Sequence, residues 1–260
     1  MFLDSPSISN VIFYPRKHEI SNYTNINENI HILKFQITDE ITIGGFFYLN
    51  KPELPSILLF HGNGELAIEY QYFAPLFFEC GVNLAVMDFR GYGFSSGHPF
   101  FSSLYLDALP IYENFNEWIK EKNYNNSIFV LGRSLGSFCA AEIGSHNPTN
   151  LHGIIFESGV GNTFKIMTRL FNITIPEIKN EILNNWSNDM KVSKFNIPTL
   201  IIHGTSDWIV PYEHAQILFK SIPQHIEKKL ITIKGAGHNN IFSFKDQYFP
   251  PLKDFITKYK

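Results

Sequence analysis

Short apolar runs alternate with helix-like segments along most of the chain after residue 56, and this alternation restricts the folds open to it. Apolar runs flanked by turn residues predict buried strands, and apolar residues at three- and four-residue spacing predict amphipathic helices. The expected strands lie at 57–60, 82–87, 127–131, 153–156, 199–202 and 229–233. The expected helices lie at 66–80, 102–122, 135–146, 212–221 and 239–258. Strands that alternate with helices favour a parallel sheet covered by helices on both faces.

Two further strands are expected ahead of this region. Residues 31–37 and 41–49 flank a turn at Asp39 and Glu40, which predicts an antiparallel hairpin. The sequence therefore predicts an α/β protein with a mostly parallel central sheet of about eight strands. At 260 residues the chain is long enough for one large core, and we expect a single domain over residues 1–260.

Residues 159–197 separate two expected strands and are too many for a simple connection. They carry apolar residues at helical spacing from Phe164 to Phe171, then Pro176, then a polar stretch around Trp186. This pattern predicts a small helical cap over the mouth of the site. Ordinary helices packed against the sheet are the alternative.

Composition and charge exclude several classes of function. Hydrophobic residues make up 44% of the chain and charged residues 17%, as in a globular protein. The formal net charge of −3 offers no attraction for nucleic acid or anionic lipid. No apolar stretch reaches the roughly 18 residues of a membrane helix, and the first residues do not resemble a signal peptide. Cys80 and Cys139 give no disulfide framework, so a cytoplasmic setting is expected. No metal-ligand spacing occurs, so we expect neither a metal nor another cofactor.

The pentapeptide Gly132-Arg133-Ser134-Leu135-Gly136 follows the expected strand at 127–131. A G-x-S-x-G sequence at a strand-to-helix turn can hold its serine on a tight bend, because the glycines let the backbone approach closely. Three other loops leave the carboxyl ends of expected strands, where open α/β sheets bind ligands. They are His61-Gly62-Asn63-Gly64, His203-Gly204-Thr205-Ser206-Asp207 and Gly235-Ala236-Gly237-His238.

These loops supply the parts of a nucleophilic site in the chain order serine, acid, histidine. A serine hydroxyl needs a base to take its proton, and a carboxylate on the far imidazole nitrogen fixes the tautomer of that base. The candidates are Ser134 as nucleophile, His238 as base and Asp207 as acid. Two backbone N–H groups must meet the developing oxyanion, and we expect them from Leu135 and Asn63.

Further segments complete a family pattern. They are Ile12-Phe13-Tyr14-Pro15, Asp88 to Gly97, His203 to Pro211 and Gly237 to Asn240, together with the His61 and Ser134 motifs. With them the sequence resembles α/β-hydrolase-fold serine hydrolases over nearly its whole length. More narrowly it is similar to the bud-emergence-type (Bem-like) ABHD branch, which includes membrane-associated esterases and protein depalmitoylases. The resemblance implies the α/β-hydrolase fold, and it implies nucleophile, acid and base roles for Ser134, Asp207 and His238. The membrane-associated members carry an N-terminal membrane helix or a lipidated cysteine cluster, and this sequence shows neither, so the resemblance implies the chemistry but not a membrane-bound depalmitoylase.

Other polar residues near the motifs have mainly structural interpretations. His61 is expected to shape the oxyanion loop, and Arg133 is expected to form a salt bridge behind the serine, with substrate contact as the alternative. Asp189 is a rival acid without strand context. We expect Asp107 to pair with Arg90. The histidines expected at the surface are His98, His146, His214 and His225. Substrate contacts are expected from Gly64, Glu65, Phe164 and Met167.

The function predicted from these residues is a hydrolase that forms an acyl-enzyme on Ser134 and cleaves a carboxylic ester or thioester. The acyl part is expected to be small to medium and apolar, because Phe-rich segments lie close to the site. The substrate is expected to be a small molecule or an acylated protein. A peptidase of the same fold and a non-catalytic ligand-binding protein of the same fold are the alternatives.

Overall fold

The computed structural model describes residues 3–19, 27–172, 174, 176–181 and 186–260. Within these residues the chain forms an eight-stranded sheet of order β1-β2-β4-β3-β5-β6-β7-β8. The strands are β1 (Ile30–Gln36), β2 (Thr42–Tyr48), β3 (Ser56–Phe60), β4 (Asn83–Met87), β5 (Ile128–Arg133), β6 (Leu151–Glu157), β7 (Thr199–Gly204) and β8 (Lys228–Ile233). β2 pairs antiparallel with β1 and β4, and the other pairings are parallel. The predicted hairpin and mostly parallel sheet are confirmed.

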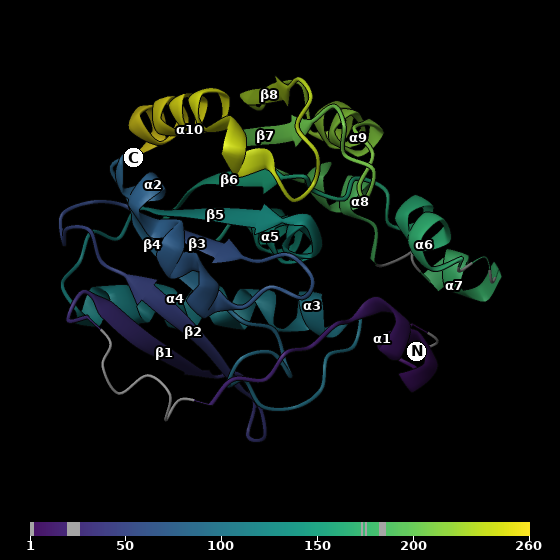
Figure 1. Cartoon of the computed structure of the whole chain (residues 1–260), viewed down its shortest axis with the longest axis horizontal. Helices are drawn as coiled ribbons and strands as arrows, with labels where there is room; N and C mark the ends of the chain where they lie inside the picture. Colours follow the sequence, from purple (N-terminus) through teal and green to yellow (C-terminus); the bar gives the residue numbers. More distant parts are fainter. Residues whose placement is uncertain (1–2, 20–26, 173, 175, 182–185) are drawn as a thin grey trace.

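Helices cover both faces of the sheet (Figure 1). α4, α5 and α9 contribute to the core on one face, and α2 and α10 contribute to the core on the other. The α-helices are α1 (Pro6–Ile12), α2 (Ala74–Phe78), α3 (Ser103–Leu106), α4 (Ala108–Glu121), α5 (Ser137–His146), α6 (Thr163–Phe171), α7 (Pro176–Glu181), α8 (Asn188–Val192), α9 (Glu213–Ser221) and α10 (Lys245–Tyr259). This is the α/β-hydrolase arrangement that the sequence predicts.

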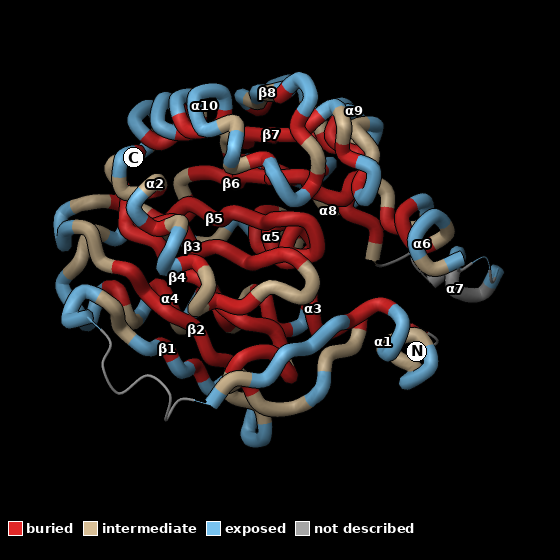
Figure 2. The backbone as a smooth tube through the Cα atoms, in the orientation of Figure 1, coloured by how far each residue is buried: buried red, intermediate tan, exposed pale blue. Residues whose placement is uncertain are grey.

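The central strands are buried on both faces (Figure 2). Side chains alternate across a strand. In β3, Leu58 and Phe60 accordingly enter one apolar core, and Ile57 and Leu59 enter the other. Burial on both faces explains why these strands appear in the sequence as continuous apolar runs.

The expected helix 239–258 forms a 3₁₀ helix, η5 (Ile241–Phe244), followed by α10. Two other expected helices are interrupted ahead of a proline. The segment 66–80 forms a 3₁₀ helix, η2 (Ala67–Tyr72), followed by α2, and the segment 102–122 divides at Asp107 into α3 and α4. In each case a proline, Pro75 or Pro110, follows the break by two or three residues. Proline lacks the N–H that would continue the preceding helical hydrogen bonds, which accounts for both breaks.

The segment 159–197 contains α6, α7 and α8. α6 and α7 project beyond the carboxyl ends of the strands, and α1 projects on the same side (Figure 1). The sequence patterns did not predict α1. The region at the carboxyl ends of β5, β7 and β8 is therefore bordered by two separate parts of the chain.

Candidate active site

Ser134 occupies a strained turn between β5 and α5. Its φ is +49°, in the left-handed region that only glycine adopts freely. The turn is held by close packing: a Cβ on Gly136 would lie 2.0 Å from the Phe60 carbonyl oxygen, and one on Gly132 would lie 2.6 Å from the Gly136 carbonyl oxygen. The glycines of the motif are thus required by contact between β5, β3 and the start of α5.

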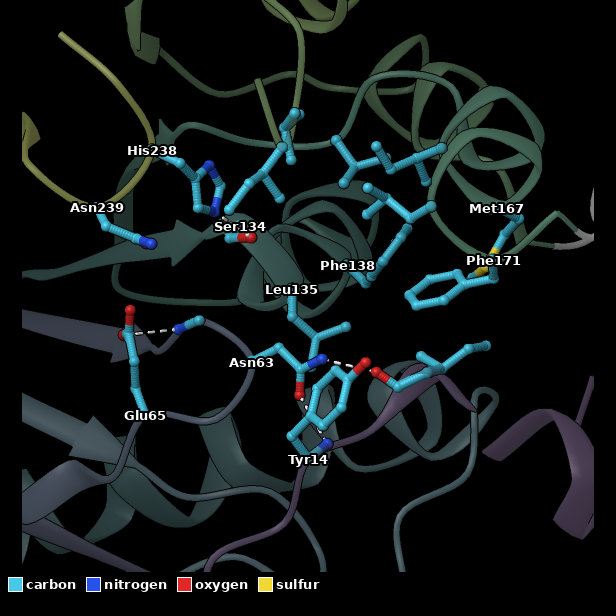
Figure 3. Close-up of a pocket in the computed structure, with 17 residues that line it drawn as sticks. Tyr14, Asn63, Glu65, Ser134, Leu135, Phe138, Met167, Phe171, His238 and Asn239 are labelled. Atoms are coloured by element: carbon cyan, nitrogen blue, oxygen red, sulfur yellow. Dashed lines mark hydrogen bonds between the residues drawn. The ribbon is translucent and has the colours of Figure 1, made fainter. Parts of the chain in front are cut away.

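The three residues predicted to form the catalytic set are brought together. His238 Nε2 lies 2.9 Å from Ser134 Oγ, and His238 Nδ1 lies 2.8 Å from Asp207 Oδ2. Because an ionised carboxylate only accepts hydrogen bonds, Nδ1 carries the hydrogen and Nε2 accepts from the serine hydroxyl. All three side chains are at most 9% exposed. Figure 3 shows Ser134 and His238 facing each other at the rim of a cavity.

Asp207 is fixed from several directions. Its Oδ1 accepts hydrogen bonds from the amides of Ile209 and Val210, at 3.0 and 2.8 Å. His203 Nε2 donates to the Val210 carbonyl at 2.8 Å and lies 3.4 Å from Asp207 Oδ2. Burial alone raises the pKa of a carboxyl group, but hydrogen bonds from His203 and His238 outweigh it and lower the pKa of Asp207. Asp207 is therefore ionised at neutral pH.

The loop before η2 is tied to the serine turn. The Gly136 amide donates to the His61 carbonyl at 3.2 Å. The Asn63 side chain accepts from the amide of Tyr14 and the hydroxyl of Tyr92, and it donates to the Ile12 carbonyl. In the described part of the chain, no hydrogen bond engages the backbone N–H of Asn63 or that of Leu135.

His61 is a buried member of an ion pair below this loop. Its Nε2 lies 3.1 Å from Asp88 Oδ1, and its Nδ1 lies 2.8 Å from the Gly62 carbonyl oxygen. Both partners are acceptors, and this arrangement favours the protonated ring, in which both nitrogens donate. Burial opposes that charge, but Asp88 outweighs it and the pKa of His61 is raised. His61 therefore shapes the loop, as the sequence predicts.

Arg133 forms the expected salt bridges behind the serine. It donates to Glu65 at 2.7 Å and to Glu157, and a third bond at 3.2 Å reaches the His238 carbonyl. Glu65 also accepts from the Gly62 amide at 2.9 Å. One guanidinium thus links the serine turn, the loop before η2 and the loop that carries the histidine.

Comparison with known proteins bears on this geometry. The sequence profile of the family described as serine aminopeptidase, S33, matches residues 52–192 and 187–243. The chain belongs to this family. Alpha/beta hydrolase domain-containing protein 17B of Xenopus tropicalis is 28% identical over 221 residues, which are 83% of this chain and 71% of that protein. The human protein of the same description is 27% identical over 221 residues, with the same shares.

Solved structures show the same fold. The Pyrococcus furiosus esterase Pf2001 superposes with a TM-score of 0.71 and 18% identity, over 95% of this chain and 98% of that one. Est1E from Butyrivibrio proteoclasticus superposes with a TM-score of 0.67 and 19% identity, over 88% and 98%. Fold and family together make this S33-family chain an α/β-hydrolase.

The S33-family hydrolase has an apolar cavity of about 380 Å³ beside Ser134 (Figure 3). Of the four residues expected to contact substrate, Glu65 and Met167 line it, but Gly64 and Phe164 do not. The Gly64 carbonyl accepts from the Arg16 guanidinium, and Lys179 lies 5.5 Å from the centre of the Phe164 ring. The cavity walls that the sequence did not predict are Ile12, Tyr14, Gly62, Phe138, Val160, Ile166, Leu170, Phe171, Ile209, Val210 and Asn239.

The remaining polar candidates of the hydrolase lie elsewhere. Asp189 accepts from the side-chain amide of Asn162 and from the Met190 amide, and it has no contact with His238. Arg90 and Asp107 form the expected ion pair. His98, His146 and His225 are exposed as predicted, but the prediction for His214 is wrong because this side chain is only 2% exposed.

His214 is buried because it anchors the start of the segment that leads into α6. Its Nδ1 accepts from the amides of Gly161 and Asn162 at 3.1 and 3.3 Å. The spacing of His214, Ala215 and Leu218 on α9 is that of a buried helix face, which is the signal that would have predicted this position.

The described residues contain no cluster of three or more potential metal-ligating side chains. Among those residues, no helix combines the length and apolar character needed to cross a bilayer.

Proposed function

We propose that this hydrolase forms an acyl-enzyme on Ser134 and cleaves a carboxylic ester or thioester whose acyl part is small to medium and apolar. The observation that carries the proposal is the hydrogen-bonded series Ser134, His238 and Asp207 at the rim of an apolar cavity. In the proposal these residues act as nucleophile, base and acid. Residues 159–197 act as a cap within a single domain.

The proposed reaction has two halves. Ser134 Oγ attacks the carbonyl carbon while His238 Nε2 takes its proton, and the free N–H groups of Asn63 and Leu135 bind the oxyanion. His238 then donates that proton to the leaving oxygen or sulfur as its bond to the acyl carbon breaks. Water attacks the acyl-enzyme with His238 again as base, which releases the carboxylic acid and restores the serine hydroxyl.

The lining of the cavity supports an apolar acyl group. Phe138, Ile166, Met167, Leu170 and Phe171 supply one wall, and among the described residues no charged residue other than Glu65 borders the cavity. Glu65 is already paired with Arg133, so it is not free to hold a substrate ammonium group. For this reason we prefer an ester or thioester, free or carried on a protein, to the peptide substrates that the family description suggests.

Covalent labelling tests the proposal. A fluorophosphonate probe should label the wild-type chain, and Ser134→Ala should abolish labelling and ester hydrolysis while leaving the thermal unfolding temperature nearly unchanged. Ser145→Ala is a matched control, because Ser145 lies on α5 and, within the described part of the chain, its hydroxyl bonds only to the Glu142 carbonyl. Persistent labelling of Ser134→Ala would show that Ser134 is not the nucleophile. Binding of short-chain esters without turnover by the wild type would favour a ligand-binding protein.

A further inference from the structure

A second cavity adjoins the apolar cavity that Ser134 lines. Its volume is about 540 Å³, and it shares Glu65 and Asn239 with the apolar cavity. Figure 3 shows these two side chains on one side of Ser134, and Met167 and Phe171 on the other. The two cavities therefore lie on different sides of the serine, which lines the apolar cavity but not the second, and they meet at two shared residues.

The loop of the proposed base builds one wall of this second cavity. Asn239 directly follows His238, and Phe242 lies in the next turn, η5 (Ile241–Phe244). Tyr70 and Phe73 face them from η2 and its end. The rings of Phe73 and Phe242 are 5.1 Å apart between centroids, so aromatic surface borders the cavity from two elements.

The charged groups around this cavity are already paired. Arg133 is bonded to Glu65 at 2.7 Å, and Glu69 is bonded to Arg16 at 2.7 Å. A charged ligand would lose hydration here without gaining an unpaired counter-ion.

The polar groups left to meet a ligand are neutral. The side-chain amide of Asn239 and the hydroxyl of Ser243 line the cavity, and neither has a hydrogen-bond partner within the described residues. Both residues are exposed and lie at the open edge of the cavity. The walls therefore combine aromatic faces with uncharged donors and acceptors.

We propose that this second cavity binds the leaving group of the substrate and selects a neutral, ring-sized group that bears an amide or hydroxyl. The proposal rests on the acyl-enzyme function proposed above. The bond between acyl carbon and leaving atom breaks as the Ser134 ester forms, and the proton that His238 took from Ser134 passes to that leaving atom. The leaving atom must therefore lie at His238 Nε2, next to the residues where this cavity begins. The apolar acyl chain then occupies the other cavity.

Three butyrate esters of para-substituted phenols test the selectivity. The substituents are a neutral carboxamide, a carboxylate and a trimethylammonium group, and each kcat/KM is divided by the hydroxide-catalysed rate of the same ester. The three esters give the same butyryl-enzyme, so their kcat values should agree where its hydrolysis limits turnover. The carboxamide should have the highest normalised kcat/KM, by about three- to ten-fold, the effect of one neutral hydrogen bond.

Two substitutions locate the effect. Asn239→Ala should remove most of the three- to ten-fold preference for the carboxamide ester. Ser243→Phe fills the cavity and should lower kcat/KM for the aryl esters more than for methyl butyrate, whose leaving group is too small to enter. Ser193→Phe, at an exposed serine that lines neither cavity, is the matched control and should change neither.

The outcomes separate the two proposals. A burst of phenol and a butyryl adduct on Ser134, together with equal normalised kcat/KM for the three esters, would overturn the leaving-group site alone. An equal loss for methyl butyrate in Ser243→Phe would do the same. Absence of both the burst and the adduct with every ester would overturn the acyl-enzyme function and the leaving-group site together.

Discussion

Asp207 performs two tasks with separate oxygen atoms, and a single substitution can separate them. Oδ1 holds the loop through the Ile209 and Val210 amides, and Oδ2 faces His238. In Asp207→Asn the amide oxygen can keep the loop contacts, but the NH₂ group faces Nδ1 and favours the wrong histidine tautomer. We expect kcat to fall by about 10⁴-fold, against about 10⁶-fold for His238→Ala.

Steady-state kinetics on an activated ester, with thermal unfolding as a control, measures this difference. The unfolding temperature of Asp207→Asn should stay close to that of the wild type. A rate within ten-fold of the wild type would mean that another carboxylate serves the histidine.

At the residue level the sequence predicted which side chains come together, because each follows a strand whose carboxyl end lies at one edge of the sheet. It did not predict Tyr14 or Asn239 as cavity walls. Tyr14 reaches the site through a hydrogen bond to Asn63, 49 positions away in the chain, and such contacts leave no local pattern. The burial of His214 was also missed: the buried face of α9 gave a local signal for it, but its hydrogen-bond partners are backbone amides of a distant loop, which leave none.

At the level of elements, α6 presents one face to the apolar cavity. Met167 and Phe171 line it, whereas Phe164 lies one turn away and does not. Each acyl methylene buried in this cavity should raise kcat/KM about three- to four-fold, from about 0.8 kcal/mol of transfer free energy. The larger side chain in Met167→Trp should fill part of the cavity, so kcat/KM should stop rising at a shorter acyl chain. The kcat/KM of p-nitrophenyl esters from acetate to decanoate measures the shift.

Phe164→Ala provides the matched control on the same helix. It shortens an apolar side chain one turn before Met167, at a position that does not line the cavity, so the chain-length optimum should not move. A shift as large as that of Met167→Trp would mean that the position of α6, and not its lining residues, sets the preference.

The elements themselves were largely predictable from apolar periodicity, since β3 to β7 are buried and continuous. The exceptions have physical causes. Pro75 and Pro110 divide helices that periodicity alone joins. α1 has only one buried residue, Ile12, so it lacks the apolar stripe that would have identified it.

For the molecule as a whole, buried titratable groups set its stability against acid. Burial and the nearby His203 lower the pKa of His214 to about 4, so between about pH 6.5 and 4 the unfolded chain binds more protons than the folded one. Burial opposes the charge of Glu65, but Arg133 outweighs it and lowers the pKa to about 2. The stability from Glu65 is present above its ordinary pKa and is lost as the pH falls toward 2. Both groups therefore destabilise the fold on acidification, His214 first and Glu65 second.

His214→Asn tests the first of these two stages. The asparagine oxygen can accept from the Gly161 and Asn162 amides and does not titrate, so the variant should lose less stability between pH 7 and 4.5. The expected difference is about 2–3 kcal/mol, or roughly 5–10 °C in unfolding temperature for a chain of this size. Each protein is compared with itself at the two pH values, so any loss of packing stability in the variant that does not depend on pH cancels. His225→Asn, at an exposed position, should keep the wild-type change. If His214→Asn kept the wild-type change too, other groups would cause the loss of stability above pH 4.5. The hydrogen bonds of His214 would then fix the start of the segment that leads into α6 without making the fold sensitive to acid.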